Sequence, residues 1–291
     1  MTRRGWLLFA AMCVLWGIPY LLIKVAVAEV SVSVLVFART AIGALVLVPL
    51  AARPGAVAIV RAHWHWLLVF AVVEVIGPWA LLSDAERLLD SSLTGLLVAA
   101  VPIIAVVAGR LMGVTERLGP LRWVGLVLGL AGVALLAAPH LDRGSGLAVG
   151  EVGLVAVGYA VGPIIAARRL TEVPNLLMTA TCLSFAALVY LGPAVLTRPA
   201  HVPTLEVLLA LGGLGLLCTA AAFVLFFELI AEVGPTRAVV FTYVNPAVAV
   251  AAGVLLLGEP LTATVLGSFA LILAGSALAT GRRPAGPTHT A

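Results

Sequence analysis

The sequence consists of long apolar stretches separated by short segments that contain arginine, glycine and proline. A helix that spans a bilayer needs about 20 mostly apolar residues, and ten stretches of about that length can be placed along the chain. Breakers such as Arg53-Pro54-Gly55 and Pro139 fall in the gaps. The pattern predicts ten transmembrane helices at about 5–26, 33–52, 65–88, 92–112, 119–138, 147–168, 175–196, 205–231, 236–257 and 262–281.

The composition of the chain is that of a protein embedded in lipid. Of its 291 residues, 63% are hydrophobic and 10% are charged, whereas about a quarter of the residues in a soluble domain are charged. A water-soluble fold needs polar cover for its surface, so we expect an all-α integral membrane protein. The net charge of +4 comes without a basic patch, and Lys24 is the only lysine. Nucleic acid is therefore not an expected partner.

The basic residues are distributed unevenly between the two sides of such a bundle. When the N-terminus and the even-numbered loops are placed inside, 12 of the 17 basic residues lie on the inner side. The positive-inside rule then predicts a multi-pass protein of the cell (plasma) membrane whose N- and C-termini are both cytoplasmic. The inner residues are Arg3, Arg4, Arg53, Arg61, Arg110, Arg117, Arg122, Arg168, Arg169, Arg237, Arg282 and Arg283.

The two halves of the chain resemble each other. The segment 116–132 (ERLGPLRWVGLVLGLAG) aligns without gaps with the segment 259–275 (EPLTATVLGSFALILAG), at an offset of 143 residues. Five helices are an odd number, so a second unit of five enters the membrane from the opposite side, as in many secondary transporters. The sequence thus predicts two inverted five-helix repeats, residues 1–143 and 144–281, and a disordered cytoplasmic tail over 282–291.

Two prolines interrupt expected helices at matching places in the halves, Pro102 in the fourth helix and Pro246 in the ninth. Proline removes a backbone donor and frees the carbonyl four residues earlier, which in hydrocarbon needs protein or cavity water as a partner. Paired broken helices indicate a central binding site, and a plain kink tolerated by packing is the alternative. Beside Pro246, the polar side chains of Tyr243 and Asn245 are expected to line a cavity or to join helices.

Two carboxylates lie within apolar stretches, where ionisable side chains are candidates for function. Glu74 in the third expected helix and Glu228 in the eighth are the candidates for proton coupling. A structural carboxylate paired with another group is the alternative for Glu74, and Glu228 is close enough to a helix end to reach the interface. Three further acids are expected to be solvated near the outer surface: Asp84, Glu86 and Asp90.

Two cations and four aromatic residues complete the candidate site. Arg39 could bind an anionic group through its planar guanidinium or pair with an acid of the third helix or of the loop after it. Lys24 could do the same or extend to the outer interface. The aromatic side chains expected to form walls of a pocket are Trp16, Tyr20, Trp79 and Tyr159, of which Trp16 and Tyr159 fall at matching repeat positions.

Glycines spaced four residues apart permit close helix contact, and such faces could support a homodimer. They occur at Gly125 and Gly129 and at Gly158 and Gly162. No Gly-x-x-x-x-Gly-Lys, His-Glu-x-x-His or Gly-x-Ser-x-Gly motif occurs in the sequence. The three cysteines lie apart from one another within apolar segments. We therefore expect no catalytic residue, no metal site and no cofactor.

One combination of motifs occurs in both halves. The second half carries Asn245-Pro246, then Leu257-Gly258-Glu259-Pro260-Leu261, then Leu273-Ala274-Gly275. The first half carries Pro102, then Thr115-Glu116-Arg117-Leu118 with threonine in place of glycine, then Leu130-Ala131-Gly132. In these motifs the chain resembles the EamA-type family of the drug/metabolite transporter superfamily. The resemblance implies a ten-helix, inverted-repeat transporter that moves small organic metabolites, often outward.

The expected function is secondary transport by alternating access, in the direction of export. The substrate would be a small organic metabolite, such as an amino acid or a drug-like compound, bound between the two repeats. A facilitator, or a channel-like or structural membrane protein without ion coupling, is the first alternative. An intramembrane enzyme is the second, and it would need a nucleophile–base pair or a metal cluster.

Overall fold

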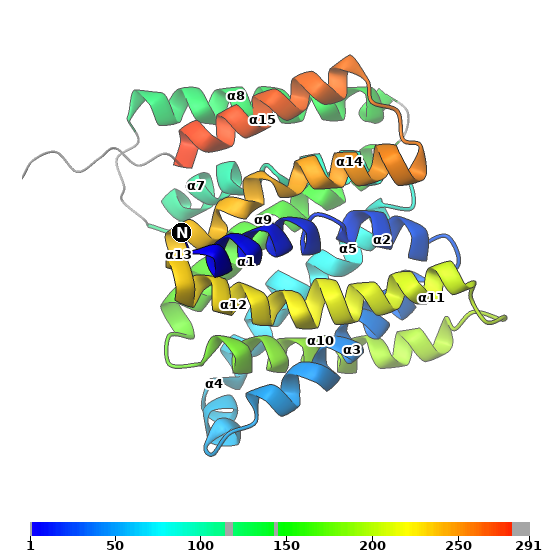
Figure 1. Ribbon diagram of the computed structural model, residues 1–291, viewed down its shortest axis with the longest axis vertical. Coiled ribbons are helices and arrows are strands. Elements are labelled where there is room, and N and C mark those ends of the chain that lie inside the picture. The colour runs from blue at the N-terminus through cyan, green and yellow to red at the C-terminus, as the bar shows by residue number, and fades with distance from the viewer. Residues whose placement is uncertain (1, 114–118, 143–144, 281–291) are drawn as a thin grey trace, which may run out of the picture.

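The computed structural model describes residues 2–113, 119–142 and 145–280, and every regular element within these ranges is helical. The helices form ten passes that run between two ends of a bundle, with the N-terminus at one end (Figure 1). Eight of the helices are long and apolar enough to cross a membrane, and two apolar helices, Asn245–Leu257 and Ala263–Leu278, are shorter. The prediction of an all-α membrane protein with about ten helices is confirmed.

The first five passes are formed by α1 (Arg3–Leu15) with α2 (Pro19–Ala26), α3 (Val32–Ala51), α4 (Ala56–Ala71) with η1 (Val72–Ile76) and α5 (Gly77–Ala85), α6 (Ser91–Val98) with α7 (Val101–Leu111), and α8 (Pro120–Asp142). The other five are formed by α9 (Gly146–Arg169), α10 (Asn175–Leu196), α11 (Leu205–Gly212) with η2 (Gly213–Ala221) and α12 (Ala222–Val233), α13 (Pro235–Ala238) with η3 (Val239–Tyr243) and α14 (Asn245–Leu257), and α15 (Ala263–Thr280).

Most of these boundaries lie within a few residues of the expected ones, and two expectations were wrong. The third pass begins at Ala56, nine residues or about two and a half turns before the expected start at 65, because Gly55 adopts a φ of 83° and lets the chain turn directly into a helix. Pro139 lies inside α8 and does not end it, since a proline near a helix end disturbs only the preceding turn. Glu116 and the tail over 282–291 lie outside the described residues.

Five passes change their helical form near the middle of the bundle. The first and fourth passes are broken between α1 and α2 and between α6 and α7, the third and eighth contain the π-helical segments η1 and η2, and the ninth contains the 3₁₀ segment η3. Pro19, Pro102 and Pro246 each stand in the first turn of the helix after a break, where the missing N–H removes no intrahelical bond. Such departures from α-helix are frequent at functional sites.

The passes pack in pairs and leave an apolar outer surface. The most extensive contacts are made by α8 with α15 and by α3 with α10. Around the bundle, large apolar side chains remain exposed: Leu45 is 76% exposed, Leu188 69% and Leu255 79%. Lipid tails cover such side chains at no cost, whereas a soluble protein rarely exposes apolar surface on this scale.

Glycine residues, which have no side chain, allow α8 and α15 to approach closely. A Cβ atom added to Gly275 in α15 would run into the backbone of Gly129 and the carbonyl oxygen of Gly125, both in α8. The spacing of Gly125 and Gly129 is therefore used for contact within the chain, as the small-residue rule for membrane helices describes.

The second glycine pair is also used within the chain. A Cβ on Gly158 in α9 would meet the carbonyl oxygen of Val73, and one on Gly162 would meet the carboxylate of Glu74, both in η1. Neither of the glycine faces expected to support a homodimer is thus free for that purpose. The homodimer itself stays a prediction and would need another surface.

We predict that Gly275→Ala destabilises the protein by about 1–3 kcal/mol, the usual cost of an overpacked contact. The added methyl group must push α15 away from backbone atoms of α8, which cannot rotate aside. Thermal unfolding of the purified protein in detergent measures the effect. Gly267→Ala is the matched control in the same helix, because a Cβ at Gly267 meets nothing within 4 Å, and equal melting temperatures for the two variants would contradict the prediction.

Candidate functional site

A cavity of about 560 Å³ lies between the passes and collects residues from both halves of the chain. All eight residues that the sequence analysis proposed for substrate binding line it, as do both helix-breaking prolines. The seventh, eighth and tenth passes contribute to the lining in addition to the passes that carry those residues. The ten are Trp16, Tyr20, Arg39, Glu74, Trp79, Pro102, Tyr159, Tyr243, Asn245 and Pro246.

Trp16 and Asn245 connect broken passes to their neighbours. Trp16, in the break between α1 and α2, donates from Nε1 to the carbonyl oxygen of Cys218 in η2 at 3.2 Å. When its side-chain amide is oriented with the nitrogen toward the neighbouring acceptors, Asn245 donates to the carbonyl oxygens of Phe241 at 3.0 Å and of Cys13 at 3.3 Å. Both side chains therefore satisfy backbone carbonyls that lipid would leave unpaired.

Arg39 places a buried positive charge beside the cavity. The side chain is 6% exposed, its Nε donates to Oγ1 of Thr219 in η2 at 3.0 Å, and its guanidinium lies 3.6 Å from the centroid of the Trp79 ring. Thr219 in turn donates to the carbonyl oxygen of Leu214 at 2.8 Å. An ion pair between Arg39 and an acid, one of the alternatives from the sequence, is not found among the described residues. The ring and the hydroxyl hold the charge in place, since a guanidinium stacks well on an aromatic face.

Glu74 presents to the same cavity a carboxylate that has no hydrogen-bond partner among the described residues. It lies in η1 and packs against Gly162 of α9, where a side chain would collide with Oε2. That oxygen is buried and accepts no hydrogen bond from the described residues. An unpaired carboxylate away from water is costly, so the position favours a proton or a hydrogen-bond donor brought by a ligand. The structure thus leaves Glu74 available for both of the roles expected of it.

An aromatic wall of the cavity was not expected from the sequence. Phe223, Phe226 and Phe227 of α12 and Phe70 of α4 line it, and the Trp16 ring stands edge-on to that of Phe223, with 5.5 Å between centroids. Residues three and four apart share one face of a helix, so the spacing of the three phenylalanines was a usable signal. It was not distinctive in a helix that is apolar on every side.

The cavity reaches one end of the bundle and is closed toward the other. Asn175, an exposed residue at the start of α10, belongs to its lining. At the opposite end, Glu259 accepts hydrogen bonds from the backbone N–H and hydroxyl of Ser91, at 2.7 and 2.8 Å, and from the N–H of Ser92 at 2.9 Å and its hydroxyl. Burial raises the pKa of the Glu259 carboxyl, but the bonds from Ser92 and Ser91 outweigh it and hold the pKa below its usual value. We call this contact the Glu259 clasp.

Two residues next to the clasp differ from their expected states. Glu86 was expected to be solvated, and this was wrong: the residue is fully buried, because the turn after α5 folds into the bundle. Lys24 does not extend to the interface. Its Nζ donates to the carbonyl oxygens of Glu86 at 2.8 Å and of Leu89 at 2.7 Å, and so holds the same turn in place.

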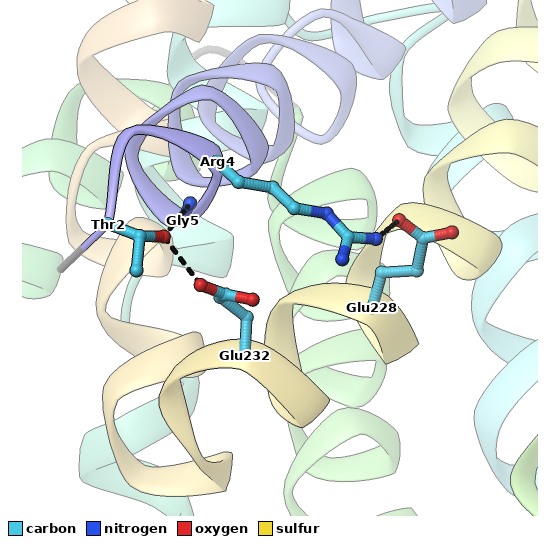
Figure 2. A network of polar contacts seen from close by, with 5 residues as sticks. All are labelled: Thr2, Arg4, Gly5, Glu228 and Glu232. Carbon is cyan, nitrogen blue, oxygen red and sulfur yellow. Dashed lines mark hydrogen bonds and ion pairs between the residues drawn. The ribbon is translucent and has the colours of Figure 1, made fainter.

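Glu228, the second candidate for proton coupling, lies away from the cavity. Figure 2 shows its carboxylate pointing toward Arg4, and the two groups form an ion pair of 2.9 Å at an exposed position. One turn further along α12, Glu232 accepts a hydrogen bond from the hydroxyl of Thr2. The Thr2 oxygen also accepts from the backbone N–H of Gly5 and so caps the start of α1. These contacts join the first and eighth passes at the N-terminal end, and exposed pairs of this kind contribute little to stability.

Comparison with known families identifies the family of the chain. The model of the EamA-like transporter family matches residues 3–138 and again residues 151–281. The chain belongs to this family. It is therefore a multi-pass membrane transporter, for which a lipid bilayer and a small-molecule substrate are the environment and the partner.

Individual relatives extend the similarity over most of the chain. The inner membrane transporter YedA of Escherichia coli strain K12 is 27% identical over 256 residues, which cover 87% of this chain and 82% of YedA. The transporter YvbV of Bacillus subtilis is 26% identical over 286 residues, which cover 94% of this chain and 90% of YvbV. A crystal structure with 22% sequence identity superposes with a TM-score of 0.67 over 96% of this chain and 98% of that one, and shows that the transporter shares its fold.

We predict that Gly162→Ala lowers the stability of the transporter by about 1–3 kcal/mol, because the new methyl group displaces the Glu74 carboxylate. A second substitution, Glu74→Ala, should remove most of this cost, since contacting residues show non-additive effects. Melting temperatures of the two single variants and of the double variant form the measurement. Gly153→Ala serves as the control in α9, because a Cβ there meets nothing within 4 Å; additive effects at positions 162 and 74 would place Glu74 elsewhere.

Proposed function

We propose that the protein is a secondary transporter that exports small organic metabolites, such as amino acids or drug-like compounds, by alternating access. The observation that carries the proposal is a cavity of about 560 Å³ that reaches one end of the bundle and is closed at the other by the Glu259 clasp. A carrier that alternates needs a site with one closed side, whereas a channel needs a continuous path. The direction of export rests on the family resemblance.

The proposal includes the division of the chain into two inverted repeats, residues 1–143 and 144–281. Several observations support it. The family model matches twice, and the π-helical segments η1 and η2 lie at corresponding places in the third and eighth passes, as the breaks before Pro102 and Pro246 do in the fourth and ninth. The most extensive helix contacts are those of the second pass with the seventh and of the fifth with the tenth, pairs that a two-fold relation between the halves would map onto themselves.

The chemistry of the cavity supports a substrate with both polar and apolar parts. Aromatic rings supply much of the wall, and Arg39 and Glu74 bring one charge of each sign to the lining. Such a surface binds the apolar body of a small molecule and fixes its orientation through a few polar contacts. We also propose that Glu74 couples transport to protons, because its Oε2 accepts no hydrogen bond from the described residues and its carboxyl group can exchange a proton in the cavity.

The distribution of basic residues predicts that both termini are cytoplasmic and that the cavity of this structure is open to the cytoplasm. Single cysteines at Arg53 and His201 test the orientation after the buried native cysteines are replaced by alanine. Both residues are exposed, and they belong to the loops between α3 and α4 and between α10 and α11, which lie at opposite ends of the bundle (Figure 1). A membrane-impermeant maleimide should label position 201 in intact cells and position 53 only after the membrane is permeabilised. The reverse pattern would show the opposite orientation.

A screen of amino acids, nucleobases and organic cations first identifies compounds that raise the melting temperature of the purified protein. Transport of these compounds is then tested in liposomes. We predict saturable counterflow of such a compound and its accumulation under a pH gradient. Glu74→Gln should abolish the gradient-driven part and leave exchange partly intact, because exchange need not release a proton, while Glu206→Gln, at an exposed position, should behave like the wild type. Flux without saturation would indicate a channel, and gradient-driven accumulation by Glu74→Gln would exclude Glu74 from coupling.

A further inference from the structure

The closed end of the cavity is built around a contact between distant parts of the chain. The Glu259 carboxylate caps the first turn of α6 by accepting from Ser91 and Ser92, which lie more than half the chain away. Gly253 in α14 is necessary for this arrangement, because a Cβ there would collide with the Glu259 carboxylate and with the Ser92 hydroxyl. Opening this end of the cavity therefore requires the loop after α14 to separate from the start of α6.

Behind the clasp lies a carboxyl group that the described hydrogen bonds leave unused. Glu86 is 0% exposed, and neither Oε1 nor Oε2 accepts a hydrogen bond from any residue that the structure describes. The backbone of the same residue is engaged, since its carbonyl oxygen accepts from Lys24 at 2.8 Å. Glu86 is thus held in position by its main chain, while no residue that the structure describes donates to its side chain to stabilise a negative charge.

The charged and titratable groups that interact with Glu86 come from three surrounding elements: Lys24 and Tyr20 from α2, Arg39 from α3 and Glu259 from the loop after α14. Each of the two cations is already committed, Lys24 to the carbonyl oxygens of Glu86 and Leu89 and Arg39 to Thr219 and the Trp79 ring. Glu259 adds a negative charge nearby. Burial raises the pKa of the Glu86 carboxyl group by more than the two cations lower it, so the neutral form is favoured.

We propose that Glu86 is a proton-binding site that keeps the outer end closed: it carries a proton while the Glu259 clasp is formed and releases it when the clasp opens. On release, the O–H bond of the carboxyl group breaks, the proton passes to water that enters from the open end, and the electron pair stays on the carboxylate. Lys24 then exchanges its two carbonyl partners for the Glu86 carboxylate. This inference rests on the proposed alternating-access function and adds a second proton site, separate from Glu74 in the cavity.

Linkage fixes the direction of the pH effect. A group that is protonated in the closed state and ionised in the open state favours the closed state at low pH and the open state at high pH. Glutamine at position 86 mimics the neutral carboxyl group and cannot release a proton. The variant Glu86→Gln should therefore stay closed at every pH, whereas loss of the clasp in Glu259→Gln should favour opening in the whole range.

The test measures opening directly and needs no substrate. A single cysteine replaces Leu82, a buried residue of the cavity lining one turn before Glu86, in a protein without the native cysteines. A membrane-impermeant maleimide is added in liposomes from the side that carries His201, between about pH 5 and about pH 9, and labelling is corrected for the pH dependence of the thiol by a cysteine at His201. The corrected rate in the wild type should rise with pH by up to about tenfold per unit, the limit for release of one proton.

Three variants decide the outcome. Glu86→Gln should label slowly and independently of pH, Glu259→Gln should label fast, and Glu29→Gln should follow the wild type. Glu29 is the matched control, because its carboxylate lies at the same end and bonds to the N–H and hydroxyl of Thr204. A pH response that persists in Glu86→Gln, or that is absent from the wild type while Glu259→Gln labels fast, would overturn the proposal.

A further variant covers the case in which Glu86→Gln does not fold. Glu86→Asp keeps a titratable group, so it should shift the pH midpoint of labelling without abolishing the response, and an unchanged midpoint would count against Glu86. Counterflow in the liposome assay distinguishes failure of the proposed proton site from failure of the proposed transport function. Saturable counterflow with labelling that ignores Glu86 would refute only the proton site, whereas absence of counterflow from a protein with the expected labelling pattern would refute the proposed transport function.

Discussion

The structure depends first on the inability of lipid to form hydrogen bonds. Every backbone group inside the hydrocarbon must find its partner within the protein, and long α-helices meet this requirement without help from neighbours. Where the passes depart from α-helix, particular side chains supply the missing partners, as Trp16 does for the carbonyl oxygen of Cys218 and Asn245 for that of Cys13. The broken passes therefore have to lie next to one another, and the residues at their breaks together surround the cavity.

Close packing is the second determinant of the structure. In lipid it depends on small residues, because lipid tails surround an apolar side chain as favourably as protein does and its burial supplies no driving force. Glycine allows α15 to contact the backbone of α8. At Gly162 the same device has a chemical consequence, since it makes room for the carboxylate of Glu74 at the edge of the cavity. One residue type thus fixes both the distance between helices and the position of a reactive group.

The charged groups of the transporter are divided by their surroundings into fixed and available ones. Arg39 is held by Trp79 and Thr219, and Glu259 by the two serines of α6, so these charges contribute to the architecture. Glu74 and Glu86 have carboxylate oxygens without a donor among the described residues. Available groups of this kind are the ones that can bind a proton or a ligand, because an unpaired charge in a low dielectric has the most to gain from a partner.

The sequence by itself determined the membrane class, the ten passes and the family, because each of these is carried by local hydrophobicity and by short motifs. It also selected the residues of the cavity well, since polar and aromatic side chains, or prolines, within an apolar stretch need a reason to be there. Only the tertiary structure showed that Glu228 pairs with Arg4 at the surface, that Glu86 is buried and that Glu259 reaches Ser91 and Ser92. Whether a residue near a helix end meets water, another charge or the interior is set by segments far away in the chain, and a local pattern holds no information about which of them will be its neighbour.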